Sequence, residues 1–281
     1  MKVFKFGGAS VKDAAGIKNV YEVLQKVGYE DVLLVVSAMG KTTNALEVVV
    51  KDYFEKSASL QSSVQEVKKY HNQILLDLFE DEKNSVFKAV NDLFAELDYF
   101  LNHNKSPNYN FVYDQIVSFG ELISTTILSH YMSYRGIKTN WIDVRNYIKT
   151  DATYRDAEVD WDSTQKSISK NVKRKVLNIT QGFLGADENG FTTTLGREGS
   201  DYTAAIFAYC LNAESVTIWK DVPGVMNADP RYFENASLLN QISYREAIEL
   251  AFYGASVIHP KTLQPLQKKE IPLYVKSFLE P

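Results

Sequence analysis

The first 37 residues alternate a short strand, a helix and a second strand, and this order strongly constrains the fold. Val3–Phe6 is short and apolar, and residues 11–27 carry apolar side chains at helical spacing. Residues 31–37, Asp-Val-Leu-Leu-Val-Val-Ser, are almost continuously apolar, which is typical of a strand buried on both faces. Such a unit crosses over with a right hand and places its strands in parallel. We therefore expect an α/β protein with a central, mainly parallel sheet.

The alternation of strands and helices continues along the chain. Further strands are predicted at 138–144, 177–183, 192–195, 215–219, 256–258 and 272–275, and helices at 111–134, 202–212, 243–253 and 262–269. Residues 45–102 contain no proline and carry two apolar stripes, which predict a helical hairpin laid over the sheet. We interpret that hairpin as a packing insertion or subunit contact. Because the sequence contains no linker or internal repeat, residues 1–281 are expected to form one domain.

Composition excludes several classes of protein. The 281 residues are 45% hydrophobic, and 31 basic against 35 acidic residues give a net charge of −4 without a basic block, which argues against nucleic acid as a partner. No apolar stretch approaches a membrane span and no signal-peptide pattern is present, so we expect a soluble, cytoplasmic protein. The single cysteine, Cys210, lies in an apolar helical run and is predicted to be a buried, inert thiol. The four histidines lack metal-ligand spacing.

The chain opens with Lys5-Phe-Gly-Gly-Ala-Ser10 directly after its first strand. Glycines let backbone N–H groups approach an anion closely, and a lysine adds a point charge for phosphate oxygens. The same segment is also compatible with an ordinary tight turn. It is not a Walker-type loop, because no G-x-x-x-x-G-K-[ST] pattern occurs. A second loop of interest, residues 38–44, follows the strand at 31–37, at the end where open α/β sheets bind ligands.

Residues 196–201, Gly-Arg-Glu-Gly-Ser-Asp, form a glycine-flanked loop before a predicted helix. A helix N-terminus favours anions, and Arg197 could form paired hydrogen bonds to a carboxylate or phosphate. Alternatively, Ser200 or Asp201 caps the helix. Ser118-Phe-Gly-Glu121 places a glycine inside a long apolar helix, which indicates a close approach there. A buried Glu121 needs a partner, either a substrate ammonium or a structural Lys or Arg.

Two further polar turns follow the strand at 215–219. Lys220-Asp221 precedes a Pro-Gly turn, where the carboxylate could meet a ribose or a metal, or the charges could simply be solvated. Residues 227–231 form another turn, with Arg231 as a candidate phosphate contact. Cations, glycines and carboxylates thus gather mostly at strand-to-helix loops. This is the inventory of phosphoryl transfer, in which positioning and charge neutralisation do most of the work.

In combination these segments resemble the aspartokinases. The motifs at 5–10, 36–44, 118–121, 196–201, 219–225, 229–231 and 254–260 occur in the order found in that family, over essentially the whole chain. The resemblance implies an amino-acid-kinase, carbamate-kinase-like fold, a three-layer α-β-α sandwich. An amino-acid-binding lobe would span about 1–185 and a nucleotide-binding lobe about 186–281. It implies ATP-dependent phosphorylation of L-aspartate to 4-phospho-L-aspartate, which opens lysine, threonine and methionine synthesis, with Mg²⁺ held mainly by the nucleotide.

The resemblance also implies roles for individual residues. Lys5 would stabilise the transferring phosphoryl group, and Asp201 would orient the lysines and the substrate. Aspartate would be held by four side chains, Thr43, Glu121, Arg197 and Ser200, with Glu121 on its ammonium and Arg197 on its α-carboxylate. The nucleotide and its phosphates would be held by Gly7, Gly8, Ser10, Lys220, Asp221 and Arg231. A homodimer is expected, with no nucleic-acid or membrane partner.

Three features depart from the family pattern. Glu198 and Ser256 stand where the family usually has glycine and lysine, and Lys220 or Lys261 could replace the phosphate contact of the latter. The pair of ACT domains that usually follows is absent from these residues. Two alternatives therefore stay open: a sister kinase for glutamate, N-acetylglutamate or UMP, or a regulatory subunit that binds ligands with little catalysis. Glu121 with Arg197 favours a free amino acid, which disfavours N-acetylglutamate and UMP.

Overall fold

The computed structural model describes residues 1–228, 233, 235–252 and 258–281. Its central feature is a six-stranded sheet in which every neighbouring pair is parallel, as the sequence predicts. The strand order is β3-β4-β2-β1-β7-β8. These strands are β1 (Lys2–Phe6), β2 (Val32–Val36), β3 (Thr139–Ile142), β4 (Leu177–Gln181), β7 (Ser215–Lys220) and β8 (Leu273–Ser277).

The order in which the chain adds strands reverses between β1 and β7, and this reversal positions the site. From β1 the chain goes to β2 on one side, whereas β7 and β8 continue on the other side. In open α/β sheets, ligands bind outside the carboxyl ends of the strands at such a reversal. β2 and β4 are buried at every residue, which explains their continuous apolar or neutral sequences.

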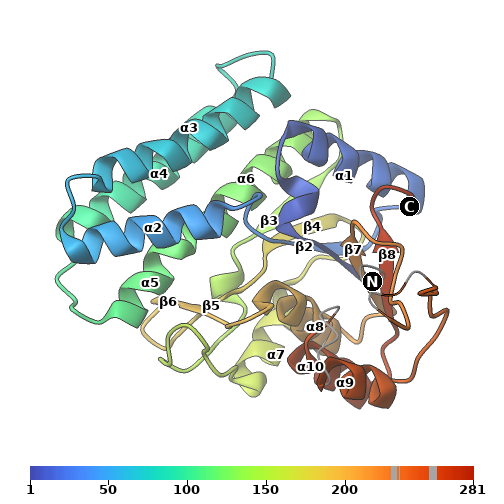
Figure 1. Cartoon of the computed structure of the whole chain (residues 1–281). Helices are drawn as coiled ribbons and strands as arrows, with labels where there is room; N and C mark the ends of the chain where they lie inside the picture. The colour runs from blue at the N-terminus through green and yellow to red at the C-terminus, as the bar shows by residue number, and fades with distance from the viewer. Residues whose placement is uncertain (229–232, 234, 253–257) are drawn as a thin grey trace.

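Helices cover both faces of the sheet, which confirms the three-layer fold (Figure 1). One face carries α1 (Ala14–Val27) and α6 (Phe119–Tyr134), and the other carries α8 (Gly199–Leu211) with α7 (Trp161–Asn171) and α10 (Pro260–Lys268) beyond it. Asp13 caps α1 by accepting the N–H of Gly16, so this helix begins three residues later than the sequence predicts. The residues before it form a short 3₁₀ turn, Gly8–Val11.

The predicted hairpin at 45–102 is three helices, α2 (Thr42–Glu55), α3 (Leu60–Leu78) and α4 (Ser85–His103). The expectation that it lies over the sheet is wrong. α4 packs on α6, and α3 packs on α1 and α2, so other helices separate the hairpin from the strands (Figure 1). The reason is that α6 is buried on nearly all sides and needs apolar partners on both faces.

The single helix expected over 111–134 is two helices, α5 (Tyr109–Val117) and α6, which meet at Ser118. The Ser118 hydroxyl donates to the carbonyl of Gln115, a local bond that competes with regular helix pairing. As a consequence, Gly120 and Glu121 lie in the first turn of α6 and not in the middle of a long helix.

Smaller elements complete the chain. A separate two-stranded antiparallel sheet pairs β5 (Leu184–Ala186) with β6 (Thr192–Thr194), and Val144–Asn146 forms a 3₁₀ turn after β3. The helix predicted at 243–253 is α9 (Tyr244–Phe252). The strand predicted at 256–258 falls mainly outside the described residues. No helix among the described residues is long and apolar enough to cross a membrane. Cys210 is buried in α8, as predicted, and burial raises the pKa of its thiol to about 12.

Candidate active site

A cavity of about 370 Å³ lies at the carboxyl ends of β1, β2 and β7. It is bounded by the two glycine-containing loops after β1 and β2, the first turn of α6 and the first turn of α8. The residues that line it are Lys5, Gly8, Ser37, Ala38, Gly40, Thr43, Glu121, Phe183, Gly196, Glu198, Gly199, Ser200, Asp201 and Lys220. Six chain segments that are separated in sequence thus meet at one place.

An ion pair between Lys5 and Asp201 forms the polar centre of this cavity. The Lys5 ammonium lies 2.6 Å from an Asp201 carboxylate oxygen, and the side chains are only 12% and 5% exposed. Lys5 comes from β1 and Asp201 from the first turn of α8, where the helix dipole is positive. The alternative role of Ser200 or Asp201 as helix cap is wrong, because α8 already begins at Gly199 and Glu198 is its N-cap residue.

The loops after β1 and β2 cross at van der Waals distance, and glycine makes this crossing possible. A Cβ at Gly8 would lie 2.8 Å from the carbonyl oxygen of Ala38 and 3.0 Å from that of Gly40. The N–H of Gly40 also donates to the carbonyl of Gly8 at 3.0 Å. A Cβ at Gly7 would lie 3.3 Å from the Lys5 ammonium nitrogen, so the backbone of the first loop also lies close to this cation.

Glu121 brings a buried carboxyl group into the same cavity. One oxygen, Oε1, accepts the N–H of Ala38 at 3.2 Å, whereas the buried Oε2 has no hydrogen-bond partner among the described residues. Burial raises the Glu121 pKa to about 8, against the opposing effects of the Ala38 N–H and the Lys5 charge. An unpartnered buried oxygen is costly, so this site is prepared for a hydrogen-bond donor or a cation.

The close approach predicted at Gly120 is confirmed. A Cβ at this position would lie 2.9 Å from the Cβ of Ala38 and 3.4 Å from side-chain carbons of Leu46 and Thr42. The absence of a side chain at Gly120 therefore lets the start of α6 contact the loop after β2. This contact brings the Glu121 carboxylate within reach of the Ala38 N–H.

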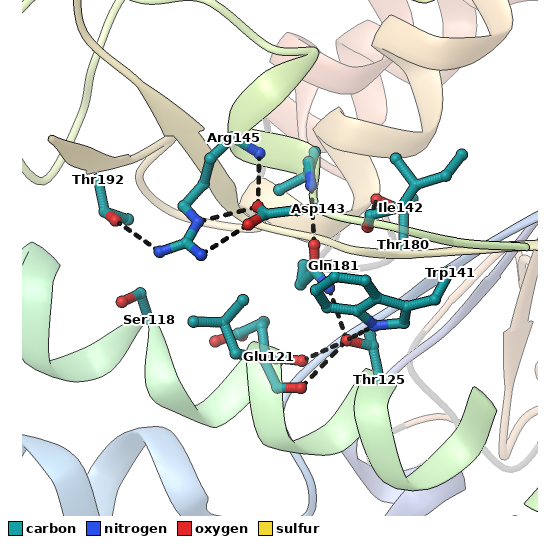
Figure 2. Close-up of polar contacts among 12 residues, drawn as sticks. Ser118, Glu121, Thr125, Trp141, Ile142, Asp143, Arg145, Thr180, Gln181 and Thr192 are labelled. Atoms are coloured by element: carbon teal, nitrogen blue, oxygen red, sulfur yellow. Dashed lines mark hydrogen bonds and ion pairs between the residues drawn. The ribbon is translucent and has the colours of Figure 1, made fainter. Parts of the chain in front are cut away.

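A buried hydrogen-bond network supports α6 one turn beyond Glu121 (Figure 2). The Thr125 hydroxyl accepts from Gln181 Nε2 at 2.7 Å and from the Trp141 indole at 3.1 Å, and it donates to the backbone carbonyl of Glu121 at 2.9 Å. Gln181 uses its other amide atom to accept the N–H of Val144. The network joins the ends of β3 and β4 to α6, and sequence reasoning did not single it out.

Two more contacts at the cavity wall were not predicted. A Cβ at Gly182 would lie 2.4 Å from the Ser200 hydroxyl oxygen, and one at Gly199 would lie 2.7 Å from the Phe183 ring. Phe183 itself adopts a left-handed backbone, with φ of 70°. The Gln-Gly-Phe sequence at the end of a predicted strand was the available signal for this turn, since a glycine in that position indicates close backbone approach.

Only some of the predicted site residues line the cavity. Seven of the predicted residues line the cavity, namely Lys5, Gly8, Thr43, Glu121, Ser200, Asp201 and Lys220. The others do not line it: Arg197 and Asp221 are exposed, Gly7 is half-buried and Ser10 is buried beside it. Arg231 and Ser256 lie outside the described residues.

Comparison with known proteins defines the class to which this fold and cavity belong. Residues 1–277 match the amino acid kinase family, and the chain belongs to this family. Within it, the chain is similar to aspartokinases. It is 34% identical to the lysine-sensitive aspartokinase 3 of Escherichia coli over 99% of its own length and 62% of that protein. It is 32% identical to a chloroplastic bifunctional aspartokinase/homoserine dehydrogenase of Arabidopsis thaliana, of which it covers 31%.

Superposition on solved structures shows the same similarity to aspartokinases. The E. coli aspartokinase III complex with aspartate and ADP superimposes with a TM-score of 0.89, at 32% identity, over all of this chain and 62% of that one. The aspartate kinase of Clostridium acetobutylicum superimposes with a TM-score of 0.84, at 25% identity, over all of this chain and 61% of that one. The present chain therefore spans about six-tenths of these two kinases.

Proposed function

We propose that this protein is an aspartokinase, which transfers the γ-phosphoryl group of ATP to the β-carboxylate of L-aspartate. The observation that carries the proposal is the unpartnered Glu121 Oε2, which lines the same cavity as the Lys5–Asp201 ion pair. Once it has released its proton, the buried Glu121 carboxylate suits the ammonium of a free amino acid, and a largely buried lysine suits a phosphoryl group. The similarity to aspartokinases along the whole chain supports the same substrate.

In the proposed reaction, a β-carboxylate oxygen of aspartate attacks the γ-phosphorus of ATP. A new O–P bond forms while the bond to the bridging oxygen breaks, and ADP leaves with the electron pair. No general base is required, because a carboxylate with a pKa near 4 is ionised at neutral pH. The protein must instead hold two anions together. Lys5 would neutralise the transferring group, and Asp201 would keep Lys5 oriented between turnovers.

The other predicted contacts form part of this proposal. Thr43 and Ser200 line the cavity and would hold aspartate, and Lys220 would contact the nucleotide from the end of β7. Arg197 is exposed at the edge of the loop at 196–201, so its predicted grip on the α-carboxylate would require the side chain to turn inward. Gly7, Ser10, Asp221 and Arg231 remain predicted nucleotide contacts.

Mg²⁺ would be held mainly by the nucleotide. No group of three or more His, Cys, Asp or Glu side chains among the described residues is arranged to hold a metal ion. Mg²⁺ in kinases is commonly bound through the phosphates of the nucleotide. Bound there, Mg²⁺ would neutralise phosphate charge. The homodimer and the cytoplasmic location stay predictions, and several plant relatives are named as chloroplastic.

The alternatives differ in what Glu121 must bind. Neither N-acetylglutamate nor UMP carries an ammonium for the buried carboxylate, whereas glutamate does. UMP kinases share the fold only, since the enzyme of Ureaplasma parvum superimposes with a TM-score of 0.55 at 17% identity. A binding subunit without catalysis would not need Lys5 and Asp201 as a buried pair.

ADP release with Mg·ATP, measured against L-aspartate, L-glutamate, N-acetylglutamate and UMP, tests the proposal. Hydroxylamine would trap the acyl phosphate as a hydroxamate. We expect turnover with L-aspartate and hydroxamate formation. Turnover with another substrate alone would move the assignment to a sister kinase, and ATP binding without turnover on any substrate would favour the regulatory subunit.

Replacement of the lysine tests its role directly. Lys5→Ala should lower kcat with aspartate by about a hundred-fold or more, because one preorganised charge at the transition state is removed. Lys2→Ala is the matched control, since Lys2 is an exposed lysine on the same strand. Near-normal turnover of a folded Lys5→Ala protein would contradict the proposed role.

A further inference from the structure

Glu198 adopts a backbone conformation that favours glycine. Its φ is 53° and its ψ is 28°, which is left-handed, and it occupies the N-cap position of α8 without a side-chain cap bond. Apart from Asn and Asp, L-residues rarely occupy this region, because their Cβ meets the neighbouring carbonyl oxygen. The strain is stored in the loop that borders the cavity. A compensating contact of the Glu198 side chain is therefore expected.

That contact is made with α10. Glu198 Oε2 accepts the backbone N–H of His259 at 2.8 Å, across 61 residues of chain. His259 is the N-cap of α10, and its ring nitrogen Nδ1 in turn accepts the N–H of Lys261. A carboxylate at this end of a helix is favoured by the helix dipole. The Glu198 charge is thus directed toward α10.

Contacts of Lys261 hold the same loop from its other side. The Lys261 ammonium donates to the carbonyl of Leu195 at 3.1 Å and pairs with Asp156 at 2.7 Å. Gly196 lies directly against Asp156, because a Cβ there would be 2.4 Å from its carboxylate oxygen. The segment from Leu195 to Glu198 is therefore fixed to the start of α10 at both of its ends.

We propose that Glu198 is a positioning residue for phosphoryl transfer. By accepting the His259 N–H, it joins the turn that precedes α8 to the N-terminus of α10. This junction holds Ser200 and Asp201 at the cavity wall, and with them the Lys5 ammonium. The inference rests on the proposed aspartokinase function for its kinetic part, whereas the junction itself is a property of the fold.

The chain contains a matched control for this residue. Glu270, at the end of α10, is also a left-handed glutamate, with φ of 54°, and its side chain is exposed. Glu198→Gly and Glu270→Gly relieve the same backbone strain, but only the first removes the acceptor of the His259 N–H. Glu198→Gln keeps an acceptor oxygen and removes the charge.

The experiment measures kcat and KM for aspartate and for ATP, together with amide hydrogen exchange over residues 258–268. Glu198→Gly should lower kcat/KM for aspartate about ten-fold, mainly through kcat, and speed exchange at His259 by a similar factor. Glu198→Gln should retain at least half of the wild-type kcat/KM. Glu270→Gly should match the wild type in kinetics and in exchange at His259.

Two outcomes would overturn the positioning role. One is a Glu198→Gly protein with the kinetics of Glu270→Gly, and the other is a Gln variant as impaired as the Gly variant, which would assign the effect to charge. Absence of aspartate turnover in the wild type would instead contradict the proposed function. In that case amide exchange at His259 alone tests whether Glu198 forms the junction. Faster exchange in Glu198→Gly supports the junction, and unchanged exchange overturns it.

Discussion

Single residues in this site combine a functional benefit with a cost in stability, and Glu121 is the clearest case. Its carboxyl group is buried, one oxygen has no hydrogen-bond partner within the described part of the chain, and its pKa is raised to about 8. The folded protein therefore retains a proton that the unfolded chain releases at its ordinary pKa of 4.5. As pH rises from 4.5 to 8, this difference progressively disfavours the folded state.

The prediction is that Glu121→Gln stabilises the ligand-free protein and that the gain grows with pH. An amide fills the same space and has no charge to bury. The midpoint of thermal unfolding of the Gln variant should exceed that of the wild type at pH 7.5, with little difference near pH 4.5. Aspartate binding should be lost in parallel, as calorimetry would show. A constant difference in the midpoint across this pH range would argue against the raised pKa.

At the scale of elements, the site depends on how α6 is seated against the sheet. The Thr125 hydroxyl accepts two N–H groups and donates to the Glu121 carbonyl, which leaves it no freedom to rotate (Figure 2). The network therefore sets the position of the turn that carries Glu121. Removal of the hydroxyl leaves the Gln181 amide and the Trp141 indole without this acceptor.

Thr125→Val should therefore lower the free energy of unfolding by about 1–3 kcal/mol, the usual cost of leaving a buried donor such as the Gln181 amide unpaired. It should also raise KM for aspartate, because the Glu121 turn loses its support. Ser129→Ala is the control, since Ser129 lies one turn further along α6 and contacts Thr139 of β3 through a single long bond. Urea unfolding and steady-state kinetics measure both effects. If the two variants lose stability equally and leave KM unchanged, the network serves the fold alone.

The elements also show which features sequence patterns can predict. The strands of the sheet were predictable because β2 is a continuous apolar run and because β4 and β7 are short, β-branched-rich segments between turns. The Lys5 turn was predictable from its glycines. The division of α5 from α6 was not, because it depends on one serine hydroxyl that turns back onto its own helix. The place of the hairpin was also missed, because an apolar stripe does not reveal whether a strand or a helix covers it. Likewise, periodicity says nothing about Gln181, whose role arises from three elements that meet only in the folded chain.

At the scale of the molecule, one sheet passes through both predicted lobes. β1 pairs with β2 on one side and with β7 on the other, with Lys2 opposite Ser215 and Phe6 opposite Trp219. The nucleotide-binding lobe predicted from residue 186 onward thus supplies the strand that covers one edge of β1. It also supplies α8, which packs on β1 and β7. The two lobes therefore share one core.

We expect from this arrangement that residues 1–185 alone do not fold cooperatively, because β1 would present an unpaired edge and its apolar face would lose α8. The intact chain should unfold in a single calorimetric transition. Circular dichroism and differential scanning calorimetry on both proteins test this. A sharp transition in the fragment would show instead that the N-terminal lobe is an independent domain.

The rate at which a thiol reagent labels the one cysteine of the chain can report how often this shared core opens. Cys210 is buried in α8, and its thiol, with a pKa of about 12, holds almost no thiolate at neutral pH. A thiol reagent therefore reacts with Cys210 mainly in molecules in which at least the last turn of α8 has opened. The same helix carries Asp201 in its first turn, so a labelling rate equal to the rate of global unfolding would show that the Cys210 end of α8 opens only together with the Lys5–Asp201 pair.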